Sequence, residues 1–268
     1  MAQPPAEEII DSPRWNRVSR IGGASHYLDD FLGELKRSVH LDLIERWGGI
    51  PSEGRVLKTD LFEESIGPDA YLPVLASRGA VAVGMDVSPA IASRARSRDV
   101  TLTASYIASD SRSLPFADST FALIVCPSTL DHFRDSRDLG RSLRELARVL
   151  TPGGRLIITL DNRQNVFDPL LRLINRMEWT PYYLGRSYTV GELRKELELA
   201  GYRVNDTTAI LQNPRLTAVA AVTIARKIGW QRLTRLVQRT LIAAQGLERT
   251  RLRYYFGSFV AAAATRPS

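Results

Sequence analysis

The feature that most constrains the fold is an alternation of short apolar runs with helical patterns. The helical patterns between and after the runs include residues 136–150 and 190–200. Buried strands that alternate with helices predict right-handed β-α-β units, and therefore a parallel sheet covered by helices on both faces. The strand candidates are the apolar runs at 55–61, 81–86, 103–108, 121–126 and 154–160.

An N-terminal helical region precedes this alternation. Apolar residues recur at helical spacing over 27–47, and Gly48-Gly49 ends the pattern. No internal repeat is present. We therefore predict a helical region over residues 1–50 and an α/β domain over 51–268.

Composition limits the kind of site and the compartment. The 268 residues contain one cysteine, Cys126, which excludes a disulfide framework and a cysteine-based zinc site, and we predict no metal site. The N-terminus lacks the pattern of a secretory signal, and no stretch approaches the roughly 20 apolar residues of a membrane span. These features predict a cytoplasmic protein.

Positive charge is concentrated in one segment. Residues 215–268 contain ten Lys/Arg and a single acid, Glu248, whereas the first 214 residues contain 26 bases and 28 acids. This asymmetry indicates an anionic partner for the segment, and an ordinary solvated face is the alternative.

In a parallel sheet the ligand binds beyond the carboxyl ends of the strands, near the switch in strand order. Candidate positions are therefore 60–67, 86–88, 109–112, 126–132 and 161–164. Asp86 ends the second predicted strand, where a carboxylate can accept hydrogen bonds from a ribose. The same residue fits a helix start in MDVSP, so both interpretations remain open.

Two longer stretches, ASDSRSLPFADSTFALIVCPSTLDHF and LRELARVLTPGGRLIITL, resemble the second half of class I S-adenosylmethionine-dependent methyltransferases of the small-molecule type. The similarity covers roughly residues 54–165, with looser matches at YTVGELRKELELAGYRV and YYFGSFVAAAATRP. It implies a Rossmann-like, seven-stranded, mostly parallel sheet with an antiparallel last strand. It also implies S-adenosylmethionine as cofactor.

The resemblance assigns roles to individual positions. Asp86 matches the acidic residue on the ribose, Asp110 the acidic residue near the adenine, and Ser111 its neighbour. Leu130 to His132 match a Leu-x-His element. The cofactor contacts expected from this match are Asp60, Phe62, Asp86, Val87, Asp110, Ser111, Cys126 and Pro127.

The turn after the first strand departs from the family. Lys58-Thr59-Asp60-Leu61-Phe62-Glu63-Glu64 stands where the family has an acidic residue and a Gly-x-Gly turn that lets the backbone approach the cofactor. The carboxylates can meet the ammonium and sulfonium charges, with Lys58 or a backbone N–H on the cofactor's carboxylate. A cofactor-free binding or regulatory module, and an enzyme using the fold for other chemistry, remain alternatives.

A base is needed only if the methyl acceptor must lose a proton. His132 is the candidate, and a packed residue at a helix start is the alternative interpretation. Asp131 and Asp161 are weaker candidates near the substrate. His40 is expected on a solvent-facing stripe, while His26 could reach the pocket. The expected apolar walls of the acceptor pocket are Trp179, Tyr182 and Tyr183.

A helical basic insertion, about 214–254, precedes the last predicted strand. Its apolar positions Leu233, Leu236, Val237, Leu241 and Ala244 share one helical face, beside a row formed by Arg232, Arg235 and Arg239. The Arg226–Arg239 face suits an anionic membrane surface, which would make the enzyme peripheral and its acceptor a lipid or lipid-linked molecule. A packed helix, a lid or a homodimer contact is the alternative. The absence of a base-flipping motif and of interleaved aromatics argues against nucleic acid.

Overall fold

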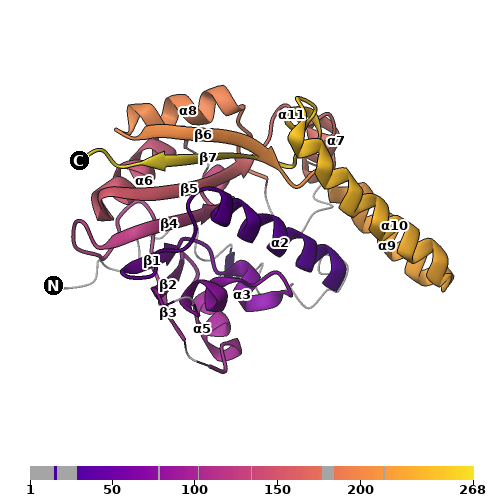
Figure 1. The fold of residues 1–268 in the computed structure, drawn as a ribbon, viewed down its shortest axis with the longest axis horizontal. Coiled ribbons are helices and arrows are strands. Elements are labelled where there is room, and N and C mark those ends of the chain that lie inside the picture. Colours follow the sequence, from indigo (N-terminus) through magenta and orange to yellow (C-terminus); the bar gives the residue numbers. More distant parts are fainter. Residues whose placement is uncertain are drawn as a thin grey trace.

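A seven-stranded sheet organises the chain (Figure 1). The computed structural model describes residues 15–16, 29–77, 79–101, 103–133, 135–176, 184–213 and 215–268. The strand order is β3-β2-β1-β4-β5-β7-β6. The strands are β1 (Arg55–Lys58), β2 (Val81–Asp86), β3 (Ala104–Ala108), β4 (Phe121–Pro127), β5 (Leu150–Asp161), β6 (Arg203–Ile210) and β7 (Phe259–Thr265).

The strand directions confirm the predicted fold class. β1 pairs in parallel with β2 and β4, and the parallel pairing continues to β3 on one side and β5 on the other. β7 runs antiparallel to both β5 and β6. The strand order therefore reverses between β1 and β4, which places the switch point of the sheet there.

Helices cover both faces of the sheet. Leu57 points to the face packed by α6 (Ser136–Val149) and α8 (Val190–Leu199), whereas Val56 points to the face packed by α2 (Asp30–Arg46), α4 (Leu72–Ala76) and α5 (Pro89–Arg98). Successive side chains of a strand point to opposite faces, so each strand contributes buried residues to the core on either side of the sheet.

Side chains at the helix starts explain where several helices begin. Asp29 accepts from the backbone N–H groups of Phe31 and Leu32 at the start of α2, and Ser88 accepts from Ile91 N ahead of Pro89. Thr189 and Glu192 form a reciprocal capping box on α8. Such caps satisfy backbone donors that the helix itself leaves unpaired.

Two sequence expectations about the first strand and α2 need correction. β1 ends at Lys58 rather than at residue 61, because the next residues turn and form the short helix α3 (Phe62–Ile66). His40 is 3% exposed, not solvent-facing, and its ring stacks on Tyr71 at 6.0 Å between centroids. Burial, followed by the nearby charge of Lys36, lowers the pKa of His40 to about 4.

The predicted insertion is a helical hairpin. α9 (Arg215–Ile228) and α10 (Gln231–Ala244) pack against each other and extend away from the sheet (Figure 1). The turn between them contains Gly229 at φ 71°, a conformation that glycine adopts without strain. After it come η3 (Gln245–Arg249) and α11 (Arg253–Phe256), and α7 (Asp168–Arg176) lies beside α11.

Within the described ranges, none of the helices has the length and apolar character that a membrane crossing requires. His, Cys, Asp and Glu side chains of those ranges form no group of three that could hold a metal ion.

Candidate functional site

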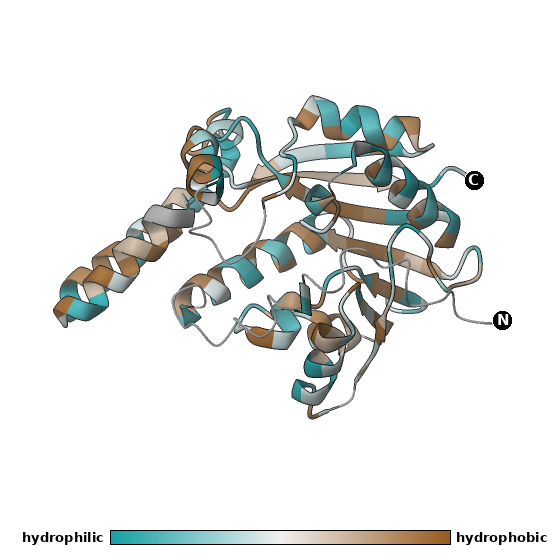
Figure 2. Ribbon diagram, turned by 180° about the vertical axis from the view of Figure 1, so that it is seen from behind, coloured by the Kyte–Doolittle hydropathy of each residue, from teal (hydrophilic) through white to brown (hydrophobic). Residues whose placement is uncertain are grey.

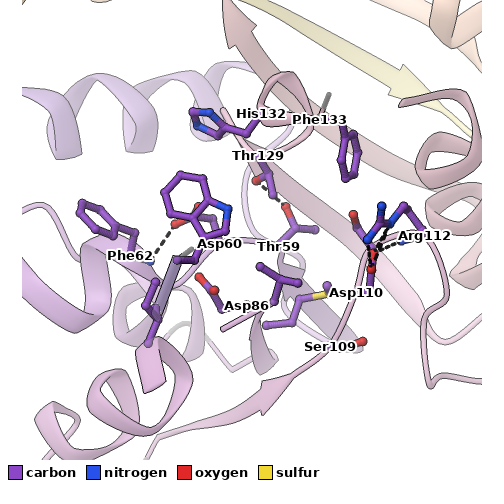
Figure 3. Close-up of a pocket in the computed structure, with 15 residues that line it drawn as sticks. Thr59, Asp60, Phe62, Asp86, Ser109, Asp110, Arg112, Thr129, His132 and Phe133 are labelled. Carbon is purple, nitrogen blue, oxygen red and sulfur yellow. Dashed lines mark hydrogen bonds and ion pairs between the residues drawn. The ribbon is translucent and has the colours of Figure 1, made fainter. Parts of the chain in front are cut away.

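A pocket opens at the carboxyl ends of β1 to β4, at the switch point of the sheet (Figure 3). It contains about 600 Å³ of empty space, part of it open to solvent. Most of its lining comes from the loops that follow the four strands. The described lining residues are Trp15, Thr59, Asp60, Phe62, Met85, Asp86, Val87, Ile91, Ser109, Asp110, Ser111, Arg112, Thr129, His132 and Phe133.

An ion-pair network lies behind the turn that follows β1, where a glycine turn was expected from the resemblance. Lys58 is fully buried, and its Nζ donates to Glu64 Oε2 at 2.7 Å, to Glu63 Oε2 at 3.1 Å and to the Asp60 carbonyl at 2.6 Å. Burial opposes the charged form of Lys58, but the two glutamates outweigh it and hold its pKa well above the usual value. The cation therefore ties α3 back onto the strand that precedes it.

A second lysine extends the network to α2. Lys36 Nζ donates to Glu63 Oε1 at 2.8 Å and to Asp69 Oδ2 at 3.0 Å. Burial alone would raise the pKa of Glu63, but the charges of Lys36 and Lys58 lower it well below its usual range. Glu64 also accepts from the backbone N–H groups of Tyr71 and Leu72, so its two oxygens fix both ends of the loop. These contacts hold the turn after β1 in place without a Gly-x-Gly sequence.

Asp86 joins the second strand to this turn. Its Oδ2 accepts from Leu61 N at 3.2 Å and its Oδ1 from Ser88 N at 2.8 Å. Each oxygen keeps a second lone pair, so the carboxylate can serve the turn and still accept from a ligand. Burial raises the pKa of Asp86 to about 7. Gly84 belongs to the same arrangement, because a Cβ there would lie 2.4 Å from Leu61 Cδ2.

Asp110 lines the pocket but is already paired. Arg112 holds it in a fork, with Nε at 3.0 Å from each oxygen and Nη2 at 2.6 Å from Oδ2, and the Arg112 backbone N–H adds a bond to Oδ1. All four lone-pair positions of the carboxylate are therefore occupied. Arg112 also pairs with Asp138 and lies over the Phe133 ring. A direct contact from Asp110 to a ligand would require Arg112 to move.

Two threonines line the pocket where β1 and β4 end, one of them, Thr129, within the candidate range 126–132. Thr59 and Thr129 are hydrogen-bonded at 3.0 Å between hydroxyl oxygens, which links the ends of β1 and β4 at the switch point. Cys126 and Pro127, expected to contact a ligand, are absent from the described lining of the pocket. Cys126 points into the core under α6, where burial raises its pKa to about 12. Alternate residues of a strand face opposite sides of the sheet, so the last residues of β4 pack into the cores. The residues of this segment that line the pocket come after β4 ends.

His132 lies at the pocket edge and Asp131 behind it. His132 Nε2 is 3.9 Å from Asp131 Oδ1, an oxygen that is buried without a hydrogen-bond partner among the described residues. Asp131 Oδ2 accepts from the Ser128 hydroxyl and from Asp161 N at 2.7 Å. Burial raises the pKa of Asp131. Asp131 and Asp161 therefore support the loop after β4 and do not line the described pocket.

Aromatic side chains that sequence reasoning missed close the pocket. Trp15 meets His132 edge-to-face at 5.1 Å between ring centroids, and Phe133 lies beneath Arg112. Neither belongs to a periodic pattern, so the sequence carries no signal for either. Arg112 lies within the candidate range 109–112, but its pairing with Asp110 was not predicted. His26, Trp179, Tyr182 and Tyr183 lie outside the described residues.

Known proteins match this fold and this part of the sequence. A family model described as a methyltransferase domain matches residues 63–158. A demethylmenaquinone methyltransferase of Corynebacterium kroppenstedtii is 29% identical over 161 residues, which are 60% of this chain and 65% of that protein. A ubiquinone/menaquinone biosynthesis C-methyltransferase UbiE of Haemophilus ducreyi is 39% identical over 70 residues, 26% of each chain.

Solved structures agree at the level of the fold. A methyltransferase of Mesorhizobium loti superposes with a TM-score of 0.56, at 16% identity, over 84% of this chain and 96% of that one. The [4+2]-cyclase SpnF superposes with a TM-score of 0.57, at 20% identity, over 85% and 80%.

Residues 63–158 match a methyltransferase domain, and the sheet as a whole has the fold of the class I methyltransferases. The sequence predicted both the seven-stranded sheet with its antiparallel β7 and a ligand site near the switch in strand order, where the pocket lies. The chain spans 65% of the first of these relatives and about a quarter of the second. These matches therefore establish the fold, and the reaction of this chain is a proposal.

Proposed function

We propose that this chain transfers a methyl group from S-adenosylmethionine to a small-molecule acceptor. The observation that carries the proposal is Asp86 at the end of β2, in the switch-point pocket, with a free lone pair on each carboxylate oxygen. A carboxylate in this position can accept from both hydroxyls of a ribose. The methyltransferase relatives agree with this assignment.

The charge of the pocket fits a cationic cofactor. Burial first, and then the charges of Glu63 and Asp86, raise the pKa of Asp60 well above its usual value. Ionising both Asp60 and Asp86 is therefore unfavourable when no ligand is bound. A bound cation would stabilise the two negative charges. The sulfonium and ammonium groups of the cofactor supply such a charge. We therefore place its amino-acid end near Asp60 and its ribose at Asp86.

The reaction needs few protein groups. When bound, the cofactor supplies a methyl group on an activated sulfonium. The residues of this chain align the acceptor, exclude water and remove a proton where the acceptor requires it. Thr59 and Thr129 hold the floor of the pocket, and Trp15 and Phe133 supply apolar walls. His132 is the residue placed to accept a proton, with Asp131 behind it.

The acceptor class is a further proposal. The names of the relatives point to a lipid-linked quinone precursor, and we propose an acceptor of this type, with an apolar chain. The cytoplasmic location, the peripheral membrane contact, a homodimer and the division at residue 50 also remain proposals. SpnF carries the same fold with a different reaction in its name, so the fold alone does not decide the chemistry.

Calorimetric titration tests the cofactor assignment. We expect both S-adenosylmethionine and its demethylated product to bind and to raise the melting temperature, since a ligand of the native state stabilises it. Transfer of a labelled methyl group to a demethylmenaquinone then tests the acceptor. Failure of both ligands to bind at millimolar concentration would exclude the proposed function. Binding without transfer to the quinone would exclude only the acceptor.

A second test concerns His132. Replacing His132 with asparagine should reduce the rate of methyl transfer by about 10²–10⁴-fold, because general-base catalysis typically contributes that factor. Cofactor affinity, measured by the same titration, should stay within about twofold of the unmodified protein, since loss of a base affects the proton transfer alone. A normal rate in the variant would show that His132 only packs against its neighbours at the end of the short helix η2 (Leu130–His132).

A further inference from the structure

The hairpin α9–α10 and its base carry most of the exposed apolar surface. Thirteen large apolar side chains of the described ranges are exposed, and ten of them lie on the hairpin, on the loop before α7 and α7 itself, or on the segment from Leu252 to Tyr255. On the hairpin, Trp230 in the turn is 59% exposed and Leu236 is 61% exposed. Figure 2 shows apolar positions running along the hairpin to its tip. The full set is Val166, Leu170, Leu173, Ile224, Ile228, Trp230, Leu236, Ile242, Leu252 and Tyr255.

The same segment carries the positive charge of the chain. Residues 224–255 contain eight Lys/Arg and one acid, a net charge of +7, which equals that of the whole chain. The single acid, Glu248, is itself paired with Arg46 at 2.7 Å. The bases are Arg226, Lys227, Arg232, Arg235, Arg239, Arg249, Arg251 and Arg253.

Arginines and apolar side chains share one exposed face of α10. Arg232, Arg235 and Arg239 fall within an arc of roughly 60° at 3.6 residues per turn. Leu236 and Ile242 flank this arc on its two sides. The stripe of Leu233, Val237, Leu241 and Ala244 is half-buried toward α9 and the sheet, so Leu236 departs from the face predicted for it.

We propose that the α9–α10 hairpin docks the protein on an anionic lipid surface, with Ile228, Trp230 and Leu236 entering the interface. The occupant follows from the combination of features. A second copy of the chain would bring an equal cluster of positive charge to a symmetric contact, which is repulsive. A nucleic acid would leave the aliphatic side chains exposed to water. Anionic headgroups above an acyl layer match both the arginines and the apolar residues.

The surface also lies on the pocket side of the molecule. α7 begins shortly after β5 ends, α9 begins shortly after β6 ends, and both strands end at the edge of the sheet where the pocket opens. An acceptor with an apolar tail could therefore pass from a membrane to the pocket without crossing the sheet. Docking goes beyond the proposed reaction and does not depend on it.

Vesicle flotation tests the inference. The full chain is mixed with vesicles of phosphatidylcholine alone or with added phosphatidylglycerol, and we expect binding to the second kind only. Replacing Arg232, Arg235 and Arg239 together with glutamine should lower the partition coefficient about 100-fold, since each basic side chain at such a surface contributes a factor of about five. Salt near 1 M should remove the preference, because the Debye length is then about 3 Å.

Two further variants separate charge from apolar insertion. Trp230→Ser with Leu236→Ser should weaken binding about tenfold or more without a change in charge. Arg96→Gln, Arg98→Gln and Arg137→Gln, on exposed arginines outside the hairpin, form the matched control and should bind normally.

The proposal would be overturned by failure of the unmodified chain to float, or by equal losses in the control. A stable dimer in light scattering that Trp230→Ser with Leu236→Ser dissociates would also overturn it and assign the face to a second copy. Cofactor titration of each variant distinguishes failure of membrane docking from failure of the proposed methyl transfer, because docking variants should bind the cofactor normally.

Discussion

Replacing Lys58 with methionine is expected to lower the free energy of unfolding by about 3–5 kcal/mol, the usual cost of removing one partner from a buried ion pair. Lys58 has no exposed surface, and its loss leaves Glu63 and Glu64 buried with one cation fewer. Denaturant unfolding followed by circular dichroism measures the change. Lys195→Met, on the exposed face of α8, is the matched control and should alter stability by less than about 0.5 kcal/mol.

A rescue variant separates the charge effect from loss of packing. Lys58→Met combined with Glu63→Gln and Glu64→Gln removes the uncompensated carboxylates and should regain a large part of the lost stability, because uncharged groups of similar volume tolerate burial far better. A loss below about 1 kcal/mol in Lys58→Met alone would mean that the network does not hold the turn. The turn would then be free to rearrange around a ligand.

Replacing Asp86 with asparagine is expected to weaken binding of S-adenosylmethionine by about 100-fold. Two hydrogen bonds from ribose hydroxyls to a carboxylate each contribute about 1.5–3 kcal/mol, and an amide replaces at most one acceptor oxygen. Calorimetric titration measures the dissociation constant. Asp99→Asn is the matched control, since Asp99 is also a buried acceptor for backbone N–H groups but lies outside the described lining of the pocket.

The pH dependence of binding gives the same variant a second readout. Burial raises the pKa of Asp86 to about 7, so the group is mostly protonated below pH 7 and mostly ionised above it. The ionised form is the better acceptor, and affinity should therefore increase as the pH rises through about 7. Asp86→Asn should lose this dependence. Equal affinity of the variant, or an unchanged pH profile, would show that Asp86 only fixes Leu61 and Ser88.

The network around Lys58 explains how the turn after β1 is held beside the pocket without a Gly-x-Gly sequence. Glycines allow a close approach of backbone to ligand, whereas here Phe62 begins a short helix whose glutamates are pulled back to the strand by one lysine. The carboxylates of Glu63 and Glu64, which do not line the described pocket, are thereby paired with positive charge. The pocket retains Asp60 and Asp86, the two carboxylates at the ends of β1 and β2.

The sequence by itself determined the sheet, its order of elements and the positions where ligand-binding residues collect. Hydrophobic period and turn residues act locally, so the strands at 81–86 and 121–126 and the helices at 136–150 and 190–200 were found within about two residues. The same local signals located Asp60, Asp86, Asp110 and His132 at strand ends, and the structure gathers them around one pocket.

The tertiary structure alone decided which of these side chains are free to contact a ligand and which are already paired within the protein. Lys58 pairs with Glu63 and Glu64, while Arg112 occupies Asp110, and Lys36 reaches Glu63 from 27 residues away. The direction of Cys126 into the core, the burial of His40 and the approach of Trp15 to His132 likewise depend on packing between distant segments. The physical reason is that period and propensity act over a few residues, whereas charge pairing and burial are set by neighbours in space that no local pattern encodes.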